Sequence, residues 1–532
     1  MLIQRFWQSR SGNFAMMFAI SFPALLTGVG LALDVANLIS AKSNLQNALD
    51  SAVLAASRLQ DSSSSRQDVF DGYFAANVKG DHYLVNAEAE LTVEPGINSI
   101  KTTATAHADV SLNFAFLFGQ SARVTAAASA YESTAKLEVA LVLDNTGSMG
   151  DSNMKALREA ATDLITTLQE EKAKKPDRKI SAALVPFVTA VNVKGVGFKQ
   201  EWIDTRKEIV DTETNLNGKN FDLESGKRVG HWELFRRLKE DAKIKNLEGK
   251  DVEWKGCVEA RPAKYNSDGS PKLGETLNLD DTPPDVMKPE TLFVPYFAPD
   301  EPGKAQAALN DGSKLNNTYL EDTYADKDKN NATILGGMQK SLAKYKTQGI
   351  KTYVKETAPG TTGPNYACPT PIVPLTEDLV ALKTEIGKMV YWYGSGTNVS
   401  EGVAWGMRVL SPGEPYTQGD PFNAQETTKV VVVFTDGENN VFGASSAPIN
   451  KSDYGSYNFV DASPARMGTN NRSTALSNVN KLTLGACTQL KDNDVRVFTV
   501  VLGADTTANR NLYSACATNK TDYYPTKNAA EL

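Results

Sequence analysis

The chain has 532 residues, with 56 basic and 63 acidic side chains and a formal net charge of −7. At roughly 100–200 residues per domain, this length predicts two to four domains. The acidic excess argues against nucleic acid as a partner, because a phosphate-binding face needs a local basic excess. Only three histidines occur, and HExxH, Walker A and GxGxxG motifs are absent. We therefore expect that the protein is not an enzyme.

An uncharged, mostly apolar stretch runs from Ser11 to Leu33. About 20 apolar residues cross the hydrocarbon core of a bilayer, so the stretch predicts a transmembrane helix over residues 14–33. Two arginines precede it and an aspartate directly follows it. This charge bias predicts a cytoplasmic N-terminus, residues 1–13, with the bulk of the chain on the outer side of the membrane.

A cleaved signal peptide is the alternative, because the small residues at 30–32 could form a cleavage site, although the stretch is longer than a typical signal core. Residues 34–60 then show helical periodicity, which predicts an amphipathic helix that continues the span. Its apolar face consists of Val35, Leu38, Leu45, Leu49, Ala52 and Ala56.

Residues 61–134 predict a small α+β module. A short helix is expected near 69–78, and alternating apolar and polar residues predict strands at 87–93, 99–110 and 124–131. We interpret this module as a spacer that positions the larger C-terminal part of the chain.

The first candidate metal ligands follow a continuous apolar run, Leu137–Leu143, which is typical of a parallel strand buried on both faces. Asp144, Thr146 and Ser148 follow it on alternate positions, and a helical pattern comes next. In parallel sheets, ligands bind at the carboxyl ends of the strands. One carboxylate and two hydroxyls favour a hard cation such as Mg²⁺, which prefers six oxygen ligands.

Two later segments offer further oxygen ligands. Asp436 follows the apolar run Val430–Phe434, and Thr397 lies in a glycine-rich turn before a helix predicted over 399–410. Both residues belong to chain turns where the ends of sheet strands are expected to gather.

Together these residues resemble the metal-ion-dependent adhesion site (MIDAS) of a von Willebrand factor type A domain, with Thr146 where that family usually has serine. The resemblance implies direct ligation by Thr146, Ser148 and Thr397, with Asp144 and Asp436 acting largely through water. It also implies an open position on the ion that accepts a carboxylate from a partner. A haloacid-dehalogenase-like phosphatase fits less well, because it needs a second aspartate where Thr146 stands.

The remaining pattern alternates strands and helices, with strands at 180–188 and 495–502 and helices at 376–390 and 475–490. The expected fold class is α/β: an N-terminal transmembrane helix and small α+β module, then a doubly wound, mostly parallel von Willebrand factor type A domain over residues 135–532. A polar insertion at about 190–375 is too long for one loop, and we expect some helix in it near 234–247 and 334–346.

The four cysteines all follow the predicted span, and an even number on an oxidising side favours disulfides. Three pairings are possible. We expect Cys257–Cys368 within the insertion and Cys487–Cys516 within the C-terminal part. Metal binding by thiolates is the alternative, although no CxxC pair occurs.

Several strings extend the resemblance to the TadG-like proteins of tight-adherence (Flp) pilus assembly: RSGNFAMMFAISFPALL near the N-terminus, KGCVEARP, ACPTPIVPLT and GVAWGMRVLSP. The pilin-like relatives carry a glutamate five residues after a processing glycine, but Met17 stands at that distance from Gly12, so prepilin-type cleavage is not expected.

Two functions remain open. The first is a binding protein of a bacterial inner membrane that faces the periplasm or the exterior and holds Mg²⁺, Mn²⁺ or Ca²⁺ at residues 144, 146, 148, 397 and 436. It would capture an acidic residue of a protein partner, such as a pilus-assembly component. The second is a structural envelope anchor in which the metal site serves only stability.

Overall fold

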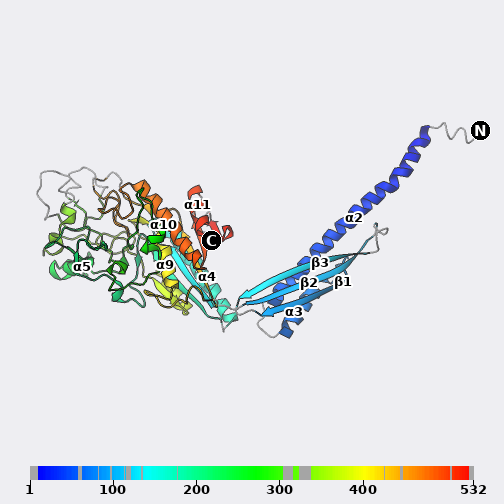
Figure 1. Ribbon diagram of the computed structural model, residues 1–532, viewed down its shortest axis with the longest axis horizontal. Coiled ribbons are helices and arrows are strands. Elements are labelled where there is room, and N and C mark those ends of the chain that lie inside the picture. Colours follow the sequence, from blue (N-terminus) through cyan, green and yellow to red (C-terminus); the bar gives the residue numbers. More distant parts are fainter. Residues whose placement is uncertain are drawn as a thin grey trace, which may run out of the picture. The chain divides into compact units, whose positions relative to one another are not determined.

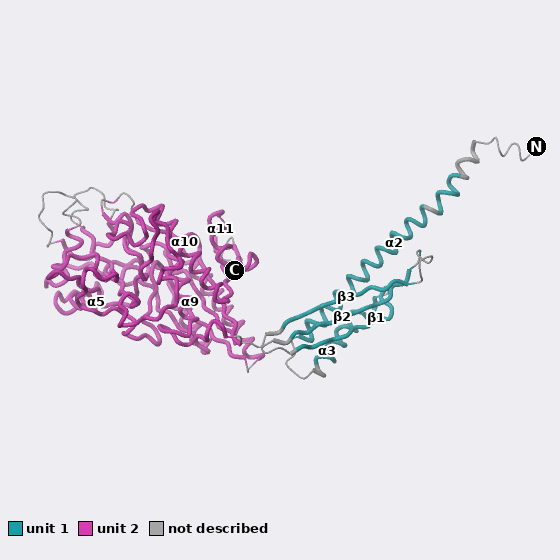
Figure 2. Tube along the Cα trace, in the orientation of Figure 1, with its two compact units in different colours: residues 1–135 teal, residues 136–532 magenta. Residues whose placement is uncertain are grey.

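The computed structural model describes residues 10–57, 63–81, 83–95, 99–112, 114, 121–133, 136–175, 178–303, 315–322, 337–424, 426–443, 447, 449–503 and 506–526. The chain divides into two compact units, residues 1–135 and residues 136–532 (Figure 2). Each unit has a hydrophobic core of its own.

The first unit is organised around one continuous helix, α2 (Arg10–Ser57), which contains the predicted transmembrane segment and residues 34–57 of the predicted amphipathic helix, whose residues 58–60 lie outside the described part. In its N-terminal part, apolar side chains such as those of Met17, Ile20 and Leu25 are exposed. Within the described residues, this is the one helix that is long and apolar enough to cross a membrane.

The C-terminal part of α2 packs on α3 (Ser63–Val78) and on an antiparallel sheet in the order β1 (Val85–Pro95), β2 (Ser99–Ser111) and β3 (Ser121–Ser133) (Figure 1). Small side chains on β2, including Ala104 and Ala106, face the buried side of α2 around Leu45. One predicted position is wrong: Val35 is 53% exposed, because the buried face of the helix begins only at Leu38.

The second unit is a mixed α/β structure built on one eight-stranded sheet, in the order β15-β14-β12-β4-β5-β6-β9 with β10 on β5. The parallel part consists of β15 (Tyr523–Thr526), β14 (Arg496–Leu502), β12 (Thr427–Thr435), β4 (Lys136–Asp144) and β5 (Ile180–Phe187). The short strands β6 (Val191–Asn192), β9 (Cys257–Val258) and β10 (Val373–Thr376) pair antiparallel.

Helices pack on both faces of this sheet, because successive side chains of a buried strand point to opposite faces. Leu141 of β4 packs in the cluster that contains α4 (Gly150–Lys174) and α8 (Leu379–Gly387). Val142, the next residue, packs in the cluster that contains α9 (Val399–Leu410) and α10 (Arg472–Asp492). Helix α9 lies very close to the sheet: a Cβ at Gly402 would lie 2.6 Å from the Phe187 ring.

The segment between β5 and β10 belongs to the same unit. It supplies β6 and β9 to the central sheet, and its aromatic residues Trp202, Phe235 and Trp254 join the same core cluster as Val142. The helix expected near 234–247 is α5 (His231–Arg236) with a π-helical turn after it, Arg237–Asp241. Of the helix expected near 334–346, residues 334–336 lie outside the described part, residues 337–340 are helical, and a 3₁₀ turn, Ala343–Tyr345, follows.

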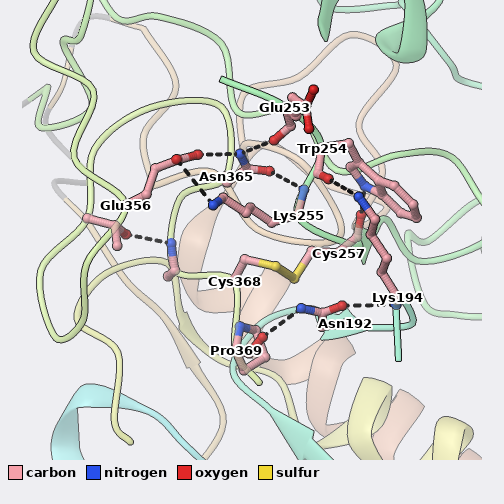
Figure 3. The surroundings of a disulfide bond; sticks show 12 residues. Asn192, Lys194, Glu253, Trp254, Lys255, Cys257, Glu356, Asn365, Cys368 and Pro369 are labelled. Carbon is pink, nitrogen blue, oxygen red and sulfur yellow. Dashed lines mark hydrogen bonds and ion pairs between the residues drawn. A yellow bond between two sulfur atoms is a disulfide. The ribbon is translucent and has the colours of Figure 1, made fainter. Parts of the chain in front are cut away.

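Both expected disulfides are present. Cys257–Cys368 joins β9 to the segment before β10, and Asn192 of β6 donates to the carbonyl of Pro369 beside it (Figure 3). Cys487–Cys516 joins α10 to α11 (Thr507–Cys516). The first bond therefore ties the segment before β10 to a strand at the edge of the sheet, and the second ties α11 to α10.

Candidate metal centre

The first part of the candidate centre is the loop after β4. Asp144 ends this strand and is fully buried. Its Oδ1 accepts a hydrogen bond of 2.8 Å from the backbone N–H of Thr146, which turns the chain over the strand end. The hydroxyls of Thr146 and Ser148 then lie 3.0 Å apart. A short 3₁₀ turn, Gly147–Met149, leads from this loop into α4.

The second part comes from the end of β12, which pairs with β4 in parallel register. The two strands therefore end side by side. Ser148 Oγ donates a hydrogen bond of 2.9 Å to Asp436 Oδ1. Thr435 Oγ1, at the last position of β12, donates one of 2.7 Å to Asp144 Oδ2. These bonds connect two loops that are 288 residues apart in the sequence.

Thr397 enters from the glycine-rich turn. It lies in β11 (Gly396–Thr397), where its partner across the strand pair is Asn440 of β13 (Asn440–Val441). Gly396 has a φ of +92°, and a Cβ there would lie 2.0 Å from the Asn440 carbonyl oxygen, so this position requires glycine. Thr397, Thr146 and Ser148 line one cavity of about 290 Å³.

The structure thus brings together all five residues that the sequence singled out. Four of them, Asp144, Thr146, Ser148 and Asp436, are linked by hydrogen bonds. The remaining one, Thr397, shares the cavity with the two hydroxyls of the first loop. The aspartates lie at the strand ends, and the three hydroxyl residues line the cavity.

The two carboxylates form an electrostatically unfavourable pair. Burial raises the pKa of Asp144, and the nearby charge of Asp436 raises it further. Burial also raises the pKa of Asp436. Their hydrogen-bond donors are the hydroxyls of Ser148 and Thr435 and the backbone N–H of Thr146, all of them neutral. A bound cation would supply the positive charge that these neutral donors do not.

The donor set fits a hard cation, because it consists only of carboxylate and hydroxyl oxygens. Within the described residues, no three His, Cys, Asp or Glu side chains gather as a metal cluster. An ion at this centre would therefore depend on the hydroxyl groups and on water, with only two protein carboxylates near it.

Two aromatic residues that the sequence analysis did not single out line the same cavity, Tyr393 and Phe442. Both are about half exposed. Tyr393 packs closely against the first loop, since a Cβ at Gly147 would lie 2.5 Å from its ring. Tyr393 directly precedes the glycine-rich turn, which was a signal in the sequence, whereas Phe442 lies six residues after Asp436 and had none.

Comparison with known proteins supports the assignment of the N-terminal helix. Residues 12–59 match the TadE/G-like family model of Flp pilus assembly. The match covers most of α2 and ends before the β-sheet of the first unit. A search of curated proteins finds no match for the chain.

Two solved pilus adhesins show a distant likeness. One is SpaC from Lactobacillus rhamnosus GG, with 10% identity, a TM-score of 0.28, and coverage of 85% of this chain and 33% of that one. The other is RrgA from Streptococcus pneumoniae, with 10% identity, a TM-score of 0.28, and coverage of 84% and 48%. The chain thus spans between a third and a half of their lengths.

Proposed function

We propose that the protein is a membrane-anchored binding protein of a pilus-assembly system, in which the second unit is a von Willebrand factor type A domain that captures an acidic partner through a metal ion. The pilus-related role is supported by the family match over residues 12–59. The binding role is supported chiefly by one observation: Ser148 contacts Asp436 while Thr146 and Thr397 line the same cavity.

The type A assignment is supported by the sheet. Parallel strands β4 and β12 lie at its centre, helices pack on both faces, and the candidate centre lies at the carboxyl ends of these strands. This is where open α/β sheets bind ligands.

In this proposal Thr146, Ser148 and Thr397 would hold Mg²⁺, or Mn²⁺ or Ca²⁺, and the two aspartates would act on it largely through water. When bound, the ion would act as a Lewis acid and offer an open coordination position to a carboxylate of the partner. The chain's own residues orient that carboxylate: the hydroxyls line the cavity, and Tyr393 and Phe442 provide an apolar rim. The partner would therefore present an acidic side chain among apolar ones.

We further propose that the N-terminal end of α2 crosses the bacterial inner membrane with the bulk of the chain outside. Two disulfides in the second unit support this orientation, because disulfides persist in oxidising compartments. The arginines that precede the apolar stretch support it as well.

The test is co-purification of the full chain from crosslinked cell envelopes, with Mg²⁺ or with EDTA. We expect that both EDTA and Asp436→Asn remove the same acidic partner. Asp151→Asn, which changes an exposed carboxylate at the start of α4, serves as the matched control and should keep the partner. Partners that are retained in EDTA and in Asp436→Asn would refute capture through the metal and favour the structural anchor.

A further inference from the structure

A second, smaller cavity lies next to the candidate metal centre. Its volume is about 30 Å³, which suits one ion or one to two water molecules. Thr397 and Asn440 line both this cavity and the larger one. The remaining polar wall comes from Thr189, from Ser395 and Asn398 on either side of Thr397, and from residues 453–458.

Two hydroxyl groups in this wall, Thr189 Oγ1 and Ser395 Oγ, are buried without a hydrogen bond of good geometry, and the hydroxyl of Tyr296 is a polar neighbour of both. Thr189 is 5% exposed and Ser395 is 4% exposed. Ser395 also has a φ of +57°, a left-handed conformation that is unfavourable for a residue with a side chain. Buried hydroxyls normally have a hydrogen-bond partner, and an ion or water molecule in the cavity would supply one.

The same cavity is lined by a buried carboxylate, that of Asp453. Its Oδ2 accepts hydrogen bonds from Asn316 Nδ2 at 3.0 Å and from the Tyr366 hydroxyl at 3.2 Å. Both donors are neutral, and burial raises the pKa of Asp453, while the backbone N–H of Ser395 and the charge of Arg472 lower it only in part. The cavity is therefore lined by one buried carboxylate whose charge is only partly compensated and by two hydroxyls without a hydrogen bond of good geometry.

We propose that this cavity is a second cation site that takes Ca²⁺, with the Asp453 carboxylate and the hydroxyls of Ser395 and Thr189 as ligands. Oxygen donors select a hard cation, and Ca²⁺ accepts irregular sets of carboxylate, hydroxyl and amide oxygens, whereas Mg²⁺ demands a nearly regular octahedron. The ion ties the turn at 394–397 to the loop at 453–458 and so holds Thr397 in position. The site itself does not depend on the proposed function of the first centre.

Calorimetric titration of the EDTA-treated full chain in detergent with CaCl₂ alone tests this site. Asp436→Asn removes the first centre, and in this background we expect one Ca²⁺ to bind. Thr189→Val and Ser395→Gly should each weaken that binding at least tenfold, and Asp453→Asn should abolish it. Thr370→Val is the matched control, because the Thr370 hydroxyl is also buried without a partner but lies outside the cavity, and it should leave the affinity unchanged.

Failure of the two proposals gives different results. If Asp436→Asn binds no Ca²⁺, or binds it equally well with Thr189→Val and Ser395→Gly, the second site is refuted and the cavity holds water. If the wild type and Asp436→Asn bind the same single ion, the second site stands and the first centre fails. Loss of Ca²⁺ affinity in NaCl relative to choline chloride would assign the cavity to Na⁺ and overturn the choice of Ca²⁺.

Discussion

Ser148 donates a hydrogen bond of 2.9 Å to Asp436 across 288 residues of sequence. The contact exists because β4 and β12 are neighbours in parallel register and end at the same edge of the sheet. The candidate centre therefore forms only when β4 and β12 are paired in the folded second unit, and disruption of this pairing would also disrupt the centre.

Mg²⁺ should stabilise the wild-type protein, because a ligand that binds only the folded state raises the free energy of unfolding, by about 2.7 kcal/mol at 100 times Kd. Asp436→Asn should lose this response, while Asp151→Asn should keep it. Thermal unfolding with and without Mg²⁺ measures the difference. An equal response of Asp436→Asn and the wild type would contradict the ligand set.

Thr146 should be replaceable by serine but not by valine. Thr146→Ser keeps the hydroxyl that lies 3.0 Å from Ser148 Oγ, whereas Thr146→Val keeps the shape and removes the oxygen. We expect Mg²⁺ affinity to stay within about threefold in the serine variant and to fall at least tenfold, about 1.4 kcal/mol, in the valine variant. Titration calorimetry measures both affinities, and equal values would show that Thr146 is not a ligand.

Lys429→Met should destabilise the second unit. The Lys429 ammonium bonds to the fully buried carboxylate of Glu138 on the neighbouring strand and to the Leu410 carbonyl. Removing one partner of a buried pair costs about 3–5 kcal/mol, and the remaining contact of Glu138 with Lys136 favours the lower end. Urea unfolding measures the loss, and adding Glu138→Gln should recover part of it. A loss below about 1 kcal/mol would show that the pair is dispensable.

Removal of the second disulfide should also weaken the fold. Cys487 and Cys516 close a loop of 29 residues, and loop-closure entropy assigns such a crosslink about 3–4 kcal/mol. The double variant Cys487→Ala with Cys516→Ala should unfold at correspondingly lower urea concentration. Reducing agent should lower the midpoint of the wild type but leave the midpoint of a variant that lacks both disulfides unchanged.

The contribution of His231 to the stability of the protein should fall as the pH drops below about 6.5. Burial lowers the pKa of His231, so the unfolded chain binds a proton that the folded protein does not take up. The stabilisation is present above the unfolded pKa and is lost as the pH falls through it. His231→Asn retains an N–H group toward the Pro295 carbonyl, which the Nδ1 atom contacts at 2.8 Å, and should reduce this pH dependence. Urea unfolding at pH 7.5 and 5.5 provides the measurement, and equal slopes in both proteins would contradict it.

The central strands and helices were predictable because burial leaves a strong pattern. The apolar runs at 137–143 and 430–434 are β4 and β12, and the helix expected over 399–410 is α9, whose start is fixed by the Asn398 cap. The two-residue strands β6 and β9 carry no periodic pattern, since only their pairing within the folded unit defines them.

For the candidate centre, the sequence supplied the oxygen ligands but not their surroundings. Tyr393 and Phe442 come together only through the fold, as does the pairing of Thr397 with Asn440. The cavity lined by Ser395 and Asp453 could not be predicted from the sequence either, because no local pattern marks a buried hydroxyl that lacks a good hydrogen bond.

Helix α2 runs without a break from its exposed apolar half to the half that packs against β2 and β3. A continuous helix transmits rotation about its axis, and the loss of one backbone hydrogen bond at Pro23 makes the apolar half the place where it bends most easily. A torque applied to α2 between Pro23 and the sheet would therefore reach the three-stranded sheet through the helix itself.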